Sequence, residues 1–134
     1  MGDESIRIIR SPITGEELRA FLDNPFPELV KYVVDIEEEI VALGGELHSD
    51  AEEILLEEGS LQRNLWGGNI YPDGPPGARL EFSALMNIRP SQDNRSMEVQ
   101  NQAVKDMMKD IVVRLIPMLA QEQSPSPPDG EASL

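Results

Sequence analysis

The sequence predicts a single α+β domain, an antiparallel sheet of about four or five strands with two or three helices. Its 134 residues suit one domain. Strand-like and helix-like segments do not alternate as regular βαβ units, which argues against a parallel sheet. The two longest clear segments, a strand over 79–88 and a helix from about Met97, carry matched apolar stripes. We therefore expect the long C-terminal helix to pack on the sheet.

The first two elements are short. Residues 6–9 are three isoleucines and an arginine before Ser11-Pro12, which is typical of a short strand. Thr14 and Glu17 have the spacing of a capping box, in which each side chain accepts a hydrogen bond from a free backbone N–H. The helix that they begin is expected to end at Asn24-Pro25.

Residues 29–43 fit two different structures. Apolar side chains recur there at the spacing of a helix, which Gly44-Gly45 would end. The same stretch is rich in β-branched residues that alternate as in a strand. A hairpin turning at Glu37-Glu38 lacks the usual glycine or asparagine. We favour two strands and keep the helix as the alternative.

A second helix and a hairpin follow. Ser49 and Glu52 form another capping box, and Gly59 is expected to end the helix that they begin. Strands over 65–71 and 79–88 are separated by turn residues, which predicts a hairpin with a long loop. One face of the second strand is apolar and comprises Leu80, Phe82, Ala84, Met86 and Ile88.

The last helix and the C-terminal tail complete the chain. The helix has one apolar stripe, formed by Val104, Met108, Ile111 and Leu115. Pro117 bounds or kinks it. Residues 121–134 are rich in proline and serine, and they contain too few apolar side chains to offset the entropy of ordering. We expect a disordered tail there and a folded domain over 4–119.

The charge of the chain excludes several functions. Its 25 acidic residues against 11 lysines and arginines give a net charge of -14, which repels nucleic acids and anionic membrane surfaces.

The absence of cysteine excludes disulfides, thiol catalysis and Cys-based metal sites. No signal peptide is evident and no apolar run reaches about 18 residues, so a cytoplasmic location is expected. The phosphate-binding, nucleophile-elbow, zincin and EF-hand motifs are also missing.

Three sequence blocks resemble those of a known family. They are GGELHSD over 44–50, LWGGNIYP over 65–72 and NIRPSQDNRS over 87–96. They are similar to the signature blocks of a family of small bacterial proteins of unknown function, over nearly all of the folded part. The resemblance implies a self-contained cytoplasmic domain with no assigned activity, and it transfers no catalytic role to any residue.

His48 is the first candidate for chemistry because it is the only histidine. In an extended segment Glu46, His48 and Asp50 would point to one side, and an imidazole with two carboxylates suits Mn²⁺, Fe²⁺ or Zn²⁺. His48 and Asp50 are therefore the candidate catalytic residues, and all three are candidate metal ligands. The simpler interpretation is structural, with Ser49 or Asp50 capping a helix. We expect no cofactor, with a divalent metal as the alternative.

Arg89, Asn94, Arg95 and Ser96 form a candidate anion-binding loop. They precede the last predicted helix, whose free N–H groups and dipole favour an anion. Guanidinium groups suit carboxylate and phosphate groups. Alternatively, both arginines pair with the chain's own carboxylates and Ser96 caps the helix.

Two further side chains have alternative roles. Trp66, which precedes Gly67-Gly68, is either a platform for a ligand or a core side chain beside a β-bulge, and we favour the core. Asp35 lies among apolar residues, so it is an edge residue, a partner for an arginine or part of a site.

Two function classes remain. The favoured one is a non-catalytic binding or interaction module, whose acidic surface engages a basic protein partner and which allows a homodimer. The alternative is a small enzyme or anionic-ligand-binding protein, with the His48–Asp50 segment facing the Arg89–Arg95 loop across one cleft. Location of the two segments on opposite sides of the molecule would exclude that enzyme.

Overall fold

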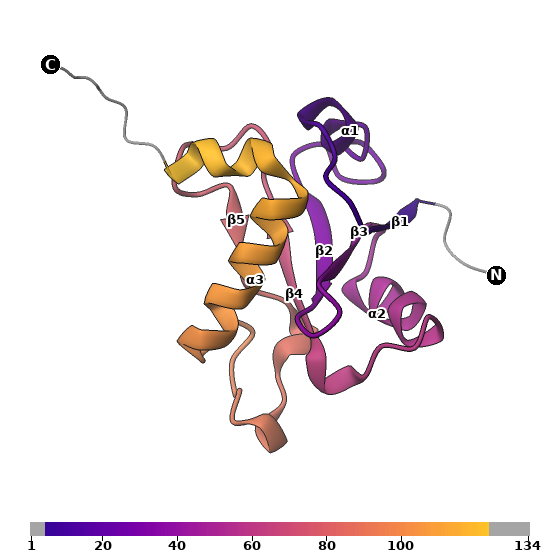
Figure 1. The fold of residues 1–134 in the computed structure, drawn as a ribbon, viewed down its shortest axis with the longest axis vertical. Helices are drawn as coiled ribbons and strands as arrows, with labels where there is room; N and C mark the ends of the chain where they lie inside the picture. Colours follow the sequence, from indigo (N-terminus) through magenta and orange to yellow (C-terminus); the bar gives the residue numbers. More distant parts are fainter. Residues whose placement is uncertain (1–4, 124–134) are drawn as a thin grey trace, which may run out of the picture.

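The computed structural model describes residues 5–123 and has a five-stranded antiparallel sheet at its centre (Figure 1). The strands are β1 (Ile6–Ile9), β2 (Val30–Asp35), β3 (Ile40–Gly44), β4 (Leu65–Ile70) and β5 (Leu80–Glu81). Their order in the sheet is β1-β3-β2-β4-β5, and every neighbouring pair is antiparallel. The predicted α+β class and strand number are confirmed.

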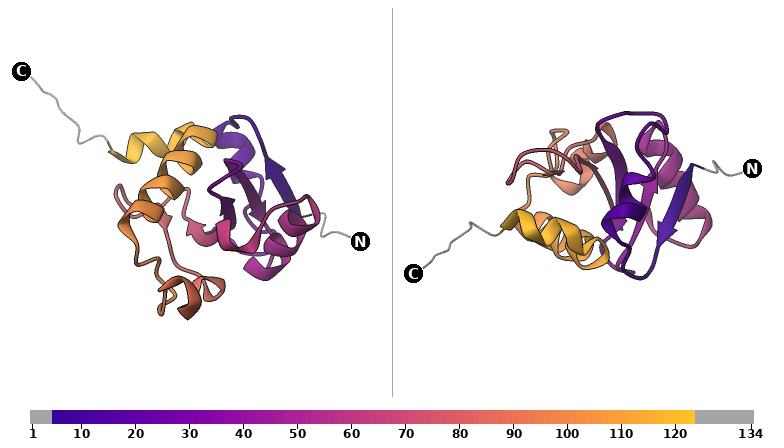
Figure 2. Two further views of the ribbon diagram at one scale, coloured as in Figure 1. Left: turned by 60° about the horizontal axis from the view of Figure 1, so that its bottom comes forward. Right: turned by 90° about the horizontal axis from the view of Figure 1, so that it is seen from above.

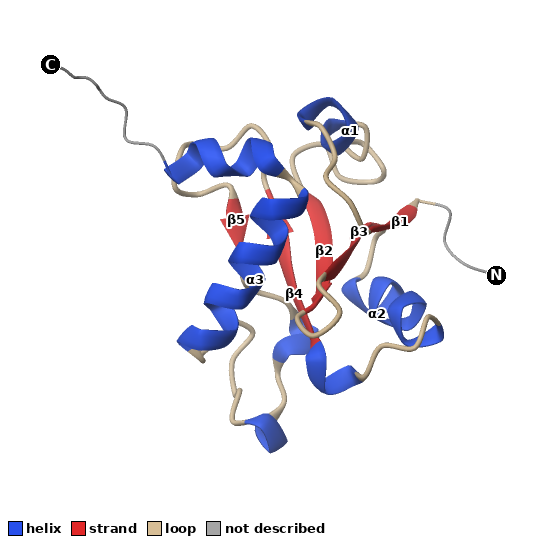
Figure 3. Cartoon of the chain, in the orientation of Figure 1, coloured by secondary structure: helices blue, strands red, loops and turns tan. Residues whose placement is uncertain are grey.

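The helices lie on both faces of the sheet (Figures 1 and 3). They are α1 (Gly15–Arg19), α2 (His48–Glu57) and α3 (Gln102–Leu115), with 3-10 turns η1 (Gln62–Asn64), η2 (Leu85–Asn87), η3 (Pro90–Gln92) and η4 (Pro117–Gln123). No helix within residues 5–123 is long and apolar enough to cross a membrane. The tail expected over 121–134 lies, from residue 124 onward, outside the described residues.

Two apolar layers follow from the alternation of side chains along the central strands. Tyr32 and Val34 of β2 point into the larger layer, which α3 covers through the buried Met108 and Ile111. Val33 points to the opposite face, where α2 contributes buried side chains to a smaller layer. Figure 2 shows α2 and α3 on opposite sides of the sheet. Packing of the C-terminal helix on the sheet is therefore confirmed, and β2 is buried on both faces.

The hairpin favoured for residues 29–43 is present, and Asp35 forms its turn. The Asp35 carboxylate accepts hydrogen bonds from the backbone N–H groups of Glu37 (2.9 Å) and Glu38 (3.0 Å). Glu39 takes the left-handed conformation at φ 60° that the turn requires. A carboxylate thus stabilises a turn that lacks glycine and asparagine.

The expected strand over 79–88 is wrong in length, since β5 contains only Leu80–Glu81. Beyond it, the chain enters η2, and Leu85 is exposed. The reason is that the Asn87 amide bonds both main-chain groups of Gly67, with N–H···Oδ1 and Nδ2–H···O distances of 2.9 Å. A side chain therefore replaces the main-chain partner that a longer β5 would have supplied.

Two predicted helix starts are also corrected. The last helix begins at Gln102, with Asn101 as its side-chain cap, because Met97 and Val99 form hydrogen bonds with the backbone of Ala84 and Phe82. The second begins at His48 after Leu47, which makes no side-chain cap hydrogen bond, so the capping box expected at residues 49 and 52 is absent. The box at Thr14 and Glu17 is confirmed.

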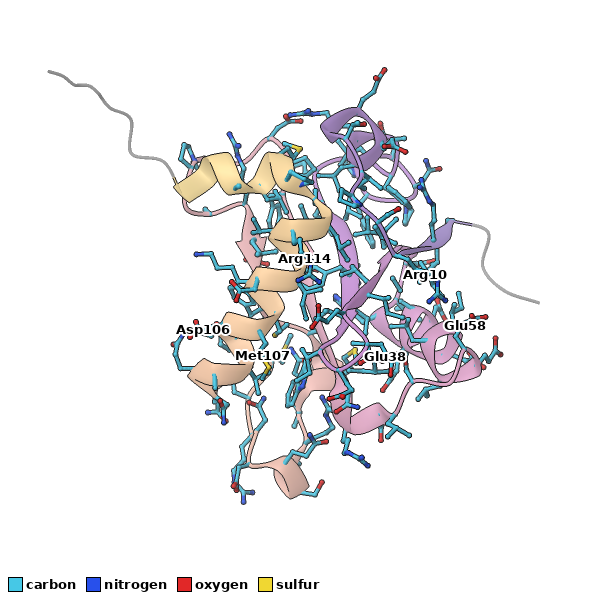
Figure 4. The ribbon with its side chains drawn as sticks, viewed as in Figure 1. Arg10, Glu38, Glu58, Asp106, Met107 and Arg114 are labelled. Carbon is cyan, nitrogen blue, oxygen red and sulfur yellow. The ribbon has the colours of Figure 1, made fainter. Side chains whose placement is uncertain are left out.

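Surface ion pairs connect distant segments of the chain. Figure 4 shows Arg10 after β1 beside Glu58 at the end of α2, with 3.2 Å between guanidinium and carboxylate. Arg114 of α3 lies 2.7 Å from the Glu39 carboxylate in the hairpin turn. Because all four side chains are about half exposed, each pair contributes less than about 1 kcal/mol to stability.

Candidate functional site

A groove of 660 Å³ lies on the α2 face of the sheet, beside the first turn of α2. Lys31 and Asn69, which are cross-strand partners in β2 and β4, line its floor. The start of α2 contributes Leu47, His48 and Ser49 to one side, and the segment after β5 contributes Ser83, Leu85 and Met86. Met97 and Glu52 also line it. We call this hollow the His48 groove.

The His48 ring lines this groove and is oriented by one hydrogen bond. Its Nε2–H donates to the carbonyl oxygen of Gly68 at 2.7 Å, which leaves Nδ1 with its lone pair. Burial lowers the pKa of His48; the hydrogen bond to Gly68 opposes that change, and the charge of Lys31 adds to it. At neutral pH the imidazole is therefore an uncharged part of the groove wall.

The two glycines of β4 allow this close packing. A side chain at Gly67 would lie 3.1 Å from the His48 ring and 3.0 Å from Ala84. At Gly68 it would overlap the Tyr32 ring and the carbonyl oxygen of Glu81. The groups that approach these glycines are therefore side-chain and main-chain groups of the same chain, and Trp66 is buried in the core as favoured above.

The three candidate metal ligands do not converge. Among the described residues 5–123, no group of three His, Asp or Glu side chains is placed to hold a metal ion. The expectation required an extended segment, whereas His48 and Asp50 lie in the first turn of α2 and Glu46 is exposed before it. In a helix, residues two apart point in different directions, so Asp50 does not share the direction of His48.

Arg89 makes structural contacts within the chain. Its guanidinium donates to the carbonyl oxygens of Gln62 (2.6 Å) and Leu65 (2.5 Å) and to the Gln92 side chain (3.0 Å). The guanidinium carbon also lies 4.0 Å from the centre of the Trp66 ring. Burial lowers the pKa of Arg89 from its ordinary value. An anion would therefore have to compete with three hydrogen bonds that the Arg89 guanidinium already makes.

The rest of the expected anion loop is divided between core and surface. The Asn94 amide is buried and donates to the carbonyl oxygens of Asn87 (2.9 Å) and Ser96 (2.8 Å). Its oxygen accepts from the N–H of Gln100 at 2.7 Å. Arg95 is exposed. Since α3 begins only at Gln102, this loop does not lie directly at a helix N-terminus, contrary to the expectation.

His48 and Arg89 contact different residues of β4, and Arg89 does not line the His48 groove. Successive side chains of a strand point to opposite faces, so Trp66 and Gly67 of β4 face different layers. The His48 ring lies over Gly67, and Arg89 stacks on Trp66. The expected cleft between the two segments therefore lacks Arg89, although Met97, just after the loop, lines the His48 groove.

We expect Arg89→Ala to lower the free energy of unfolding by about 2–3 kcal/mol, because it removes two hydrogen bonds to main-chain carbonyls and the stacking on Trp66. Urea denaturation followed by Trp66 fluorescence measures this loss. Arg95→Ala is the matched control, and its exposed side chain should change stability by less than about 0.5 kcal/mol. Equal losses for both variants would contradict the structural role of Arg89.

Lys31 is the groove residue that the sequence analysis missed. It shares the α2 face with Val33, since the two are separated by one residue in β2. A lysine on a covered face of a central strand is unusual, because lysine is rarely buried without a partner. Lys31 can therefore be recognised as unusual only when β2 is known to be a central strand.

A second hollow of 430 Å³ lies near β5. Polar groups that line it already have partners: the Tyr71 O–H donates to Glu81 at 3.1 Å, and Asp73 is paired at 2.8 Å with Arg19, which lies outside the hollow. Burial and the charge of Glu81 raise the pKa of Tyr71, so its hydroxyl stays protonated. The His48 groove offers more uncommitted polar groups, and we take it as the candidate site.

Fold and groove together define a small antiparallel α+β domain with a ligand-sized hollow on one face of its sheet. A family model described as "Protein of unknown function (DUF5674)" matches residues 7–115. The chain therefore belongs to the DUF5674 family. No curated protein and no solved structure matches the chain. The matched stretch includes the His48 groove and nearly all of the sheet.

Proposed function

We propose that this domain is a binding module and that the His48 groove receives the apolar part of its ligand. The observation that supports this most is a gathering of exposed apolar side chains. Leu47, Leu85 and Met97 come from three separate segments, have 52%, 71% and 45% of their surface exposed, and line one groove. Apolar surface gathered around a hollow of this size is typical of a ligand site.

Binding is favoured over catalysis by the state of His48. A general base that activates a nucleophile needs a hydroxyl or thiol within hydrogen-bond reach. In the described part of the chain, the one hydrogen bond of the His48 ring orients it through Nε2 to the main-chain oxygen of Gly68, and no side-chain hydroxyl is bonded to Nδ1. The basic protein partner, homodimer and cytoplasmic location expected from the sequence remain predictions.

The test uses Nile red, a neutral apolar dye, with the domain labelled at its methionine methyl groups for NMR. Dye binding should shift the signals of Met86 and Met97 in the groove and leave that of Met107 unchanged. Met107 is a suitable internal control because it is 41% exposed on α3, outside the groove (Figure 4).

We expect Leu85→Asp to weaken dye binding by about tenfold or more, because the dye would cover the exposed Leu85 side chain, and complete burial of a leucine contributes about 1.5–3 kcal/mol. Leu61→Asp is the matched control, since Leu61 is 48% exposed and does not line the groove. Fluorescence titration gives both affinities. If the two variants bind the dye equally well, or if Met107 shifts as much as Met97, the groove is not the binding site.

A further inference from the structure

We propose that the ligand of the His48 groove is an amphipathic monocarboxylate, a small organic acid with an apolar body and one carboxylate that binds Lys31. This inference rests on the proposed function, because it identifies the chemistry of the ligand for the same groove. The apolar body would lie against Leu47, Leu85 and Met97, and the carboxylate would lie at the groove floor.

Lys31 carries the argument because its charge is not paired. In residues 5–123 no carboxylate forms an ion pair with Lys31, although the chain contains 25 acidic residues. Its ammonium lies 5.0 Å from the centre of the Phe26 ring. Such a contact stabilises the cation through the ring face and leaves its N–H groups able to bind an anion. Lys31 is half-buried, so a carboxylate there gains more than it would on an open surface.

Other groups along the groove favour a negative end on the ligand. The hydroxyls of Ser49 and Ser83 both line it, and within the described residues neither donates a hydrogen bond to another group. The start of α2 also lies at the groove, and because Leu47 provides no side-chain cap, main-chain N–H groups remain free there, although Asp50 in the first turn offsets part of the positive dipole end. These groups supplement Lys31 and do not by themselves define the site.

A single negative charge fits the groove better than two. Glu52 also lines it, and its carboxylate accepts a hydrogen bond from Gln62 at 3.2 Å. Glu52 also interacts electrostatically with Arg89, so its charge is directed toward η1. One unpaired cation, one acidic side chain and a net charge of -14 disfavour a phosphate or a dicarboxylate. The apolar side chains of the groove would contact the rest of the ligand.

The experiment compares octanoate, octan-1-ol and octylamine on the unaltered protein. These probes share an apolar chain and differ in the charge of the head group. We expect octanoate to bind about tenfold tighter than octan-1-ol, as measured by the shifts of the Met86 and Met97 methyl groups during titration. We expect octylamine to bind most weakly, because Lys31 repels it. This comparison requires no variant to fold.

Two variants then test whether Lys31 causes the preference for octanoate over octan-1-ol. Lys31→Gln should abolish the difference between octanoate and octan-1-ol, and Arg63→Gln should preserve it, because Arg63 is an exposed cation outside the groove. If octan-1-ol binds the unaltered protein as tightly as octanoate, the inference of a carboxylate ligand is overturned, but the proposal that the groove binds an apolar ligand is not. If neither probe shifts the groove methyl groups, the proposed function fails as well.

Discussion

Replacement of Gly68 by alanine should lower the free energy of unfolding by about 3–5 kcal/mol, a large part of the stability of a small domain. An added Cβ would overlap the ring of Tyr32 and the carbonyl oxygen of Glu81. Tyr32 is fully buried, and its hydroxyl donates to that same oxygen at 2.8 Å. The two obstacles hold each other in place, so β4 would have to separate from β5 to admit the methyl group.

Urea denaturation followed by fluorescence of Trp66, the only tryptophan, measures this effect. Gly67→Ala should cost less, about 1–3 kcal/mol, because none of its closest neighbours at 3.0–3.1 Å is a main-chain atom, and two of them, in the His48 ring and the Met86 side chain, can move. Gly74→Ala, in the exposed turn before β5, should cost less than about 1 kcal/mol and serves as the control. A Gly68→Ala protein as stable as Gly74→Ala would show that β4 and β5 do not pack as described.

Asp35→Ala should lower the free energy of unfolding by about 2–4 kcal/mol, even though it relieves part of the net charge of -14. The Asp35 side chain is fully buried and accepts a hydrogen bond from the Ser60 hydroxyl at 2.6 Å. It also accepts the two backbone N–H groups that form the turn of the β2–β3 hairpin. Alanine would leave these donors without a partner and open a small cavity between the hairpin and the end of α2.

Two further variants separate the contributions of Asp35. Asp35→Asn keeps the shape and one acceptor oxygen for the turn, so it should cost about 1–2 kcal/mol. Ser60→Ala removes only the bond to the buried hydroxyl and should cost a similar amount. Urea denaturation measures all three. If Asp35→Ala is no more destabilising than Ser60→Ala, the turn does not depend on the carboxylate.

Elements whose cause is local could be predicted from the sequence. The capping box of α1 requires only Thr14 and Glu17, which lie three residues apart and bond each other's backbone. The apolar stripe of α3 likewise depends on spacing within one helix. The turn between β2 and β3 was harder to predict, because Asp35 replaces the residues that usually signal a turn.

Elements decided by distant contacts could not be predicted. Alternation over 79–88 indicates a long strand, but Asn87 binds Gly67, which lies twenty residues earlier, and the strand ends early. For the same reason the extended segment at Met97 and Val99, which bonds the end of that strand, delays the start of α3.

The candidate site was predicted in part. His48 was named because it is the only histidine, and it does line the groove. Arg89 was named for its charge, but its bonds to the carbonyl oxygens of Gln62 and Leu65 depend on tertiary structure. Lys31 was missed because its placement depends on the order of the strands.

The side-chain amide of Asn87 also affects whether the edge of the sheet can pair with other protein molecules. Exposed main-chain N–H and C=O groups at a sheet edge are a template on which a strand of another molecule can add, the first step of fibrous aggregation. Past the two residues of β5, the edge of β4 would present such groups at Gly67, but the Asn87 side chain occupies both. At the other edge, β1 is only four residues long and includes Arg7. The protein thus closes one edge with a side chain and leaves the other too short and too charged for efficient growth.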